Sequence, residues 1–260
     1  MRAIAHTPAS AFRRGMMRRS DLFPVAEAGP RTFDALRTYG CERRPIMRAA
    51  GWPAAVPPLD GAERFLKGAM DGAMAALLLL LFAPFMAVIA LVIRLESPGP
   101  ALFRQERVGW NGRRFTILKF RTMRWAPEPG APLQTVRRDP RLTRTGGFLR
   151  RSSLDELPQL INVLRGEMSL VGPRPHAVGM RTEDRLGSDI VAGYALRHRV
   201  KPGMTGWAQV NGCRGGVAHA AQLRRRVALD LEYIERWSLL LDLHILLRTI
   251  RAVLTTENAF

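Results

Sequence analysis

The stretch Gly72-Ala-Met-Ala-Ala-Leu-Leu-Leu-Leu-Leu-Phe-Ala-Pro-Phe-Met-Ala-Val-Ile-Ala-Leu-Val-Ile93 contains no charged residue. A helix needs about 20 apolar residues to cross a bilayer, so this stretch is long enough. Pro84 lies in its middle, where it removes a backbone hydrogen bond and favours a kink. We therefore expect a membrane helix, either a straight span or a helix that enters the bilayer and returns. A buried core helix of a soluble protein is a weaker alternative at this length.

Basic residues flank the apolar stretch on both sides, namely Arg64, Lys67, Arg94, Arg104 and Arg107. Positive charge marks the cytoplasmic side of a membrane protein. A straight span would export one of the two basic parts, whereas a helix that turns back at Pro84 keeps both in the cytoplasm. Non-helical backbone inside a bilayer is costly unless protein covers it, so re-entrant helices are rarer than spans. These residues alone leave both topologies open.

The charge balance narrows the possible partners. The chain has 260 residues with 40 Lys and Arg against 22 Asp and Glu, a formal net charge of +18. This excess favours polyanions, meaning nucleic acid, an anionic membrane surface or phosphate-bearing substrates. Two cysteines and five scattered histidines show no metal-ligand spacing, which fits a reducing compartment and disfavours a metal held by histidines.

The chain divides into three parts. Residues 1–60 are rich in arginine and proline and predict a flexible basic N-terminal extension. Residues 61–96 contain the membrane helix, and residues 97–260 form the remaining domain. In that domain 101–103 and 114–118 predict short strands joined by a turn at 110–112. Apolar residues at helical spacing predict a helix over 157–164, and 223–254 is strongly helical.

Asp155-Glu156 admits two interpretations. Ser153 and Glu156 match a helix capping box, and Asp155 could itself be the cap before Pro158. Alternatively, an aspartate can attack phosphorus to form an acyl phosphate, and adjacent carboxylates can hold Mg²⁺ together with phosphate oxygens. Arg150 and Arg151 precede the pair, and with a helix N-terminus they would favour an ionised Asp155.

Two proline-containing segments are candidates for phosphate binding or for plain turns. Gly172-Pro-Arg-Pro175 holds Arg174 on a stiff loop, where its guanidinium could form a bidentate contact with a phosphate. Lys201-Pro-Gly203 predicts a type II turn. Lys119 and Arg121 flank Phe120, as in an alternating edge strand. None of these motifs is specific alone.

Their order along the chain is specific, and it resembles the bacterial sugar transferases, the monotopic phosphoglycosyl transferases. The resemblance covers about residues 62–254. It is carried by the blocks Phe103-Arg-Gln-Glu-Arg-Val-Gly109, Leu118-Lys-Phe-Arg-Thr-Met123, Leu154-Asp-Glu-Leu-Pro-Gln-Leu-Ile-Asn-Val-Leu164, Met168-Ser-Leu-Val-Gly-Pro-Arg-Pro175, Leu196-Arg-His-Arg-Val-Lys-Pro-Gly-Met-Thr-Gly-Trp-Ala-Gln-Val-Asn-Gly212 and Leu229-Asp-Leu-Glu-Tyr233.

The resemblance implies an α+β, membrane-associated catalytic domain with a re-entrant membrane helix broken at Pro84 and amphipathic interfacial helices. It implies that Asp155 attacks a UDP-sugar, leaving a covalent phospho-sugar, and that Asp155 and Glu156 hold Mg²⁺. The phosphate-binding residues it implies are Arg174, Arg150, Lys119 and Arg214. Two departures are Ala83, where relatives often have serine, and Cys213, which precedes Arg214.

The implied reaction is transfer of a hexose-1-phosphate to polyprenyl (undecaprenyl) phosphate, as in the exopolysaccharide-type members. It implies a location at the cytoplasmic face of the bacterial inner membrane, whose anionic lipids attract the basic chain. The alternative function is a non-catalytic basic scaffold that binds anionic lipid. A nucleic-acid binder is not expected, because it would leave the apolar stretch without a role and no recognition motif of that class is present.

Overall fold

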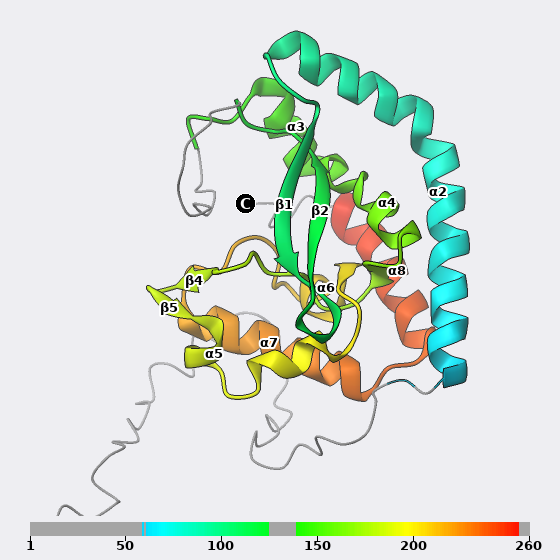
Figure 1. The fold of residues 1–260 in the computed structure, drawn as a ribbon, viewed down its shortest axis with the longest axis vertical. Helices are drawn as coiled ribbons and strands as arrows, with labels where there is room; N and C mark the ends of the chain where they lie inside the picture. Colours follow the sequence, from blue (N-terminus) through cyan, green and yellow to red (C-terminus); the bar gives the residue numbers. More distant parts are fainter. Residues whose placement is uncertain (1–58, 60, 125–138, 255–260) are drawn as a thin grey trace, which may run out of the picture. The chain divides into compact units, whose positions relative to one another are not determined.

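The computed structural model describes residue 59 and residues 61–124 and 139–254, so the predicted N-terminal extension lies almost wholly outside the described residues. Helices and strands are mixed, as expected for an α+β protein (Figure 1). The helices are α2 (Gly61–Glu96), α3 (Arg144–Ser152), α4 (Gln159–Leu164), α5 (Gly187–Ile190), α6 (Trp207–Val210), α7 (Ala220–Glu235) and α8 (Leu239–Leu254). The strands are β1 (Leu102–Val108), β2 (Arg114–Phe120), β3 (Ser169–Val171), β4 (Arg181–Thr182), β5 (Arg185–Leu186) and β6 (Gly203–Thr205).

Helix α2 is the apolar helix that the sequence predicts. It is long and apolar enough to cross a membrane, with a mean hydropathy of 3.0 in its most apolar window. Pro84 lies inside it without ending it, and Figure 1 shows the helix bending part-way along its length. One face packs on the rest of the protein through Ala75, Ile89 and Ile93. The other face exposes Leu77, Leu80, Leu81, Phe85, Val88, Leu91, Val92 and Leu95.

Both ends of α2 are tied to the same globular unit. Near the start, the Lys67 ammonium donates to Asp242 Oδ2 of α8 at 2.6 Å, and both side chains are buried. At the end, Glu96 Oε1 accepts a hydrogen bond from the backbone N–H of Arg144 at 2.8 Å. The two ends of α2 therefore stay with one body of protein.

Strands β1 and β2 form the predicted antiparallel hairpin. Their register runs from Leu102 opposite Phe120 to Val108 opposite Arg114, so both strands are longer than the sequence indicated. The turn at 110–112 is confirmed, and Asn111 adopts a left-handed conformation there with φ of 51°. Asparagine tolerates this region better than most residues, which explains its place in the turn.

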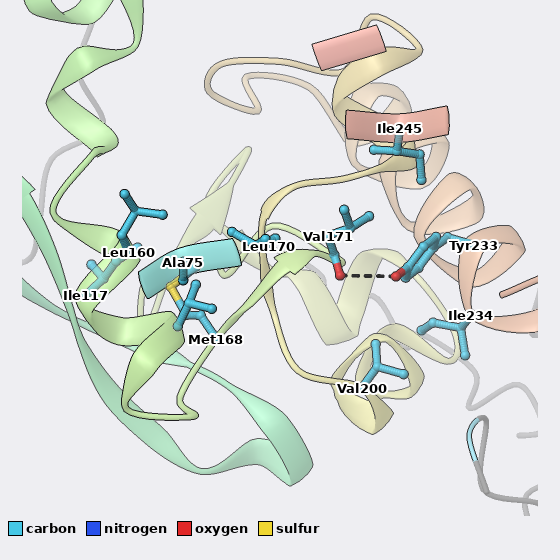
Figure 2. Close-up of a cluster of buried hydrophobic side chains, with 11 residues drawn as sticks. Ala75, Ile117, Leu160, Met168, Leu170, Val171, Val200, Tyr233, Ile234 and Ile245 are labelled. Atoms are coloured by element: carbon cyan, nitrogen blue, oxygen red, sulfur yellow. Dashed lines mark hydrogen bonds between the residues drawn. The ribbon is translucent and has the colours of Figure 1, made fainter. Parts of the chain in front are cut away.

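The main apolar core lies around β3 and β6, which pair in parallel (Figure 2). Tyr233 of α7 donates its hydroxyl to the carbonyl oxygen of Val171 at 3.1 Å, inside this core. A Cβ at Gly203 would lie 2.1 Å from the backbone nitrogen of Gly172, so glycine is required by close approach of the two strands. Gly203 lies in β6 without a positive φ, and the predicted type II turn is therefore wrong.

The predicted helix over 223–254 is two helices. Helix α7 ends at Glu235 and α8 begins at Leu239, after a short connection. At this point the buried carboxylate of Asp242 holds α7 and α8 together, because it accepts hydrogen bonds from Tyr233 at 2.7 Å and from Trp237 at 3.1 Å. Beside α2 (Figure 1), helix α8 exposes a second set of apolar side chains, namely Leu240, Leu243, Leu247 and Ile250.

Candidate active site

Asp155 and Glu156 lie in a 3-10 turn, residues Leu154–Glu156, between α3 and α4. Helix α3 ends at Ser152, and the next residue, Ser153, has a left-handed conformation with φ of 58°. Ser153 makes no side-chain capping bond, and Asp155 lies inside the 3-10 turn, whereas the residue that precedes α4 is Pro158. Both capping interpretations are therefore wrong, and the two carboxylates are available for other contacts.

Glu156 binds two cationic side chains of the site. Its Oε1 accepts from Lys119 Nζ at 2.7 Å and from Arg174 Nη2 at 2.5 Å, while Oε2 accepts from Arg174 Nη1 at 3.1 Å. The Gly172–Pro175 loop thus places Arg174 in a bidentate contact with a carboxylate, and its contact with a phosphate stays a prediction. Burial opposes ionisation of Glu156, but Arg174 and Lys119 outweigh it and hold its pKa well below the usual range.

The carboxylate of Asp155 has a different environment from that of Glu156. Its side chain is 8% exposed, and within the described ranges no hydrogen bond or ion pair occupies its carboxylate. Burial and the adjacent charge of Glu156 raise its pKa to about 6, against the opposing effects of Lys119, Arg150 and Arg174. Arg150 favours the ionised form of Asp155, as expected, but burial and the charge of Glu156 have the larger effect, so the pKa lies above its usual value.

The structure brings the other predicted site residues near this pair, with different roles. Arg150 donates from Nε to Thr122 Oγ1 at 2.9 Å, and its charge acts on Asp155. Arg214 donates to Ser153 Oγ at 2.9 Å and to the carbonyl oxygen of Ala252 at 2.9 Å. Arg214 therefore ties the end of α8 to the turn that carries Asp155. Pro84 belongs to α2 and not to this site.

Two residues of the site were not predicted from the sequence to belong to it. Arg107 donates to the carbonyl oxygen of Pro175 at 3.2 Å and to Gln105 Oε1 at 2.5 Å. Burial and the nearby charge of Arg174 lower its pKa to about 10. Gln159, the first residue of α4, is 1% exposed. Arg107 and Gln159 both lie in sequence blocks that carry the family resemblance. Nothing in their spacing indicated that β1 and α4 bring them together in the site.

A buried ion pair supports the loop behind Arg174. Arg197 donates to Asp230 Oδ2 from Nε at 3.0 Å and from Nη2 at 2.6 Å, and the two side chains are 1% and 2% exposed. The same Nη2 donates to the carbonyl oxygen of Arg174 at 2.8 Å. This pair fixes the backbone from which the Arg174 guanidinium reaches Glu156.

The carboxylates fit a magnesium ion that takes its remaining ligands from substrate. Among the described residues, no group of three or more His, Cys, Asp or Glu side chains is placed to hold a metal. Mg²⁺ commonly binds through one or two carboxylates plus phosphate oxygens and water. The open carboxylate of Asp155 suits such binding directly, whereas Glu156 would first have to release a hydrogen bond to Lys119 or Arg174.

The net charge of the site favours a substrate with several negative charges. Five cations, Lys119, Arg107, Arg150, Arg174 and Arg214, surround or adjoin two carboxylates in the described part of the chain. Burial lowers the pKa of Lys119 and of Arg150, and Glu156 and Asp155 oppose that effect. Like charges gathered in a partly buried site repel one another unless an anion compensates them. A diphosphate matches this excess.

Comparison with known proteins agrees with this geometry. The model of the family described as bacterial sugar transferase matches residues 62–256. A UDP-glucose:undecaprenyl-phosphate glucose-1-phosphate transferase of Caulobacter vibrioides is 52% identical over 194 residues, covering 75% of this chain and 72% of that protein. An exopolysaccharide production protein of Rhizobium leguminosarum bv. phaseoli is 46% identical, covering 75% of this chain and 98% of that protein.

Longer relatives match as well. An undecaprenyl-phosphate glucose phosphotransferase of Komagataeibacter xylinus is 47% identical over 230 residues, which cover 87% of this chain and 43% of that protein. The chain thus spans less than half the length of this relative. The match of the family model includes every residue of the site described above, and by that match the chain belongs to the bacterial sugar transferase family.

Proposed function

We propose that this protein transfers a hexose-1-phosphate from a UDP-sugar to polyprenyl (undecaprenyl) phosphate, the initiating step of exopolysaccharide or other surface-glycan assembly. The family and the printed activities of the relatives support this reaction. The observation that carries it is the pair of unlike carboxylates. Asp155 is buried and unoccupied, while Glu156 beside it is held by two cations in a site with excess positive charge.

The proposed reaction has two displacements at one phosphorus. A carboxylate oxygen of Asp155 attacks the β-phosphorus, the bond from that phosphorus to the bridging oxygen breaks, and UMP leaves with that oxygen. The product is an aspartyl phospho-sugar. An oxygen of polyprenyl phosphate then attacks the same phosphorus, which restores the carboxylate and forms a polyprenyl diphospho-sugar.

The side chains of the site have separate tasks in this scheme. Glu156 keeps Lys119 and Arg174 beside Asp155, so that both cations are close to the incoming phosphates. Arg150 favours the ionised form of Asp155, which is the nucleophilic form. We assign Mg²⁺ binding to Asp155 and Glu156. When bound, the ion would neutralise charge on the diphosphate and so make attack by an anion feasible.

We further propose that α2 enters the cytoplasmic leaflet of the bacterial inner membrane and returns, with its bend near Pro84. Both of its ends contact the same globular unit, through Lys67 and Glu96. A straight span would place those ends about 30 Å apart across the bilayer. The exposed apolar faces of α2 and α8 would contact lipid, and the net charge of +18 would favour the anionic leaflet.

Cysteine accessibility tests this topology. In a Cys41→Ser/Cys213→Ser background, Glu63→Cys and Pro98→Cys should both react with a membrane-impermeant maleimide in sealed inverted vesicles. Leu81→Cys, on the exposed apolar face, should stay unlabelled in the same vesicles because lipid covers it. Labelling of only one of the two end positions would show a straight span and refute the re-entrant arrangement.

UMP release tests the reaction. Membranes containing the full chain, polyprenyl phosphate and Mg²⁺ should release UMP from at least one member of a panel that includes UDP-glucose, UDP-galactose and UDP-N-acetylgalactosamine. Removing Mg²⁺ with EDTA should stop the release. Stable membrane binding without UMP release from any donor would instead support the non-catalytic lipid-binding scaffold.

A further inference from the structure

A small cavity beside Glu156 has the chemistry of an anion subsite. Its volume is about 10 Å³, and its lining is Arg107, Ile117, Lys119, Gln159, Arg174 and Pro175. A cavity of this size admits one oxygen-sized group. Three of the six lining side chains are cationic, and the nearest carboxylate, Glu156, is already bound to two of them.

Two buried donors in this lining have no partner among the residues that the structure describes. Gln159 is 1% exposed, and its Nε2 forms no hydrogen bond. Arg107 uses Nη1 and Nη2 on Pro175 and Gln105, but its buried Nε forms none. A buried donor without an acceptor destabilises the folded state, so two of them beside one polar cavity require an explanation. An acceptor with negative charge satisfies both the donors and the surrounding cations.

We propose that this cavity takes a non-bridging oxygen of the phosphoryl group that Asp155 attacks, and that Gln159 and Arg107 stabilise the charge on that oxygen. The identity of the oxygen rests on the proposed function, whereas binding of an anion here does not. Charge on the non-bridging oxygens must be compensated as the phosphoryl group passes between two anionic partners. Donors that are already in place supply that compensation without reorganisation.

The cross-strand register explains how these residues converge. Phe103 lies opposite Lys119, and Arg107 lies opposite Phe115, so Lys119 and Arg107 belong to the alternate positions that share one face of the β1–β2 hairpin. Gln159 reaches the same cavity from the first turn of α4. Arg174 reaches it from the loop after β3. Three segments that are distant in sequence therefore supply the lining.

Anion binding is tested first, with inorganic pyrophosphate and Mg²⁺ as the probe and thermal unfolding of the full chain in detergent as the readout. Gln159→Met keeps the side-chain length but removes the donor, and it should weaken pyrophosphate binding about 10-fold. Gln159→Glu keeps the shape but places negative charge at the cavity, so it should bind pyrophosphate more weakly than the Met variant. If Gln159 has only a structural role, the Glu variant should bind pyrophosphate more tightly than the Met variant. Glutamate is closer to glutamine in shape and polarity, and Arg107 and Lys119 would stabilise its charge.

Single turnover is tested second, with a UDP-sugar that the wild type consumes. Gln159→Met and Arg107→Lys should each lower the rate of the UMP burst about 100-fold, the usual effect of removing one such donor. The matched control is Gln209→Met, in α6 and outside the cavity lining, which should retain the wild-type burst. If the wild type consumes UDP-sugar and both cavity variants match it in pyrophosphate affinity and burst rate, the subsite is refuted while the proposed function stands. If the wild type binds pyrophosphate through Gln159 but releases no UMP, the proposed function fails and the anion subsite stands.

Discussion

Asp155→Asn should abolish the covalent step. With UDP-sugar and Mg²⁺ but no lipid acceptor, the wild type should release UMP in an amount equal to the enzyme present, and the sugar phosphate should stay attached at Asp155. The Asn variant lacks the nucleophilic oxygen, so its burst should fall by about 10³-fold or more, as for other deleted nucleophiles. Rapid-quench measurement of UMP and intact-protein mass spectrometry check the two halves of this expectation.

Glu156→Gln is the companion variant in that experiment. It leaves the nucleophile in place but weakens the contacts that hold Lys119 and Arg174, so its burst should be slower yet should reach the same amplitude. A normal turnover rate in Asp155→Asn would show that another residue is the nucleophile. A strict requirement for polyprenyl phosphate before any UMP appears would show direct transfer in a ternary complex.

The same two variants should change stability in opposite directions. Burial and Glu156 raise the pKa of Asp155 from 3.8 to about 6, a shift of roughly 2 units, and each unit corresponds to about 1.4 kcal/mol. Ionised Asp155 therefore costs the folded state up to about 3 kcal/mol above pH 6. Asp155→Asn removes this cost and should raise the free energy of unfolding at pH 7.5. Glu156→Gln leaves Lys119 and Arg174 without their charged partner and should lower it by about 2 kcal/mol or more.

The pH dependence of the free energy of unfolding distinguishes an effect of the raised Asp155 pKa from general effects of substitution. Because the folded-state pKa of Asp155 lies above the unfolded value, the wild type loses stability as pH rises from about 4 to 6. The advantage of Asp155→Asn should therefore be small near pH 4 and complete above pH 7. Thermal unfolding in detergent with EDTA measures it, and the surface variant Asp189→Asn should stay within about 0.5 kcal/mol of wild type. An equal loss of stability in both site variants would contradict the assigned environments.

Local patterns in the sequence predicted most of the secondary structure. The apolar stretch that contains Pro84 is a helix, and the two strands with a turn at 110–112 form a hairpin. These features depend on residues close together in the chain, such as Asn111 at its turn. The predictions that were wrong involve contacts between distant residues. Gly203 is required by close approach to Gly172, and the C-terminal helical region divides just before Asp242, which bonds the distant Lys67.

In the site, too, the sequence indicated the residues involved but not the contacts between them. From the sequence alone one could determine that the chain has a membrane helix, which blocks it shares with the bacterial sugar transferases, and that Asp155-Glu156 and Arg174 are its candidate catalytic residues. Only the tertiary structure decided how the two carboxylates differ. Glu156 is paired with Lys119, 37 positions away, and with Arg174, 18 positions away, while Asp155 is left buried and unoccupied. Ionisation depends on burial and on charges brought near by folding, and neither is encoded in the spacing of adjacent residues.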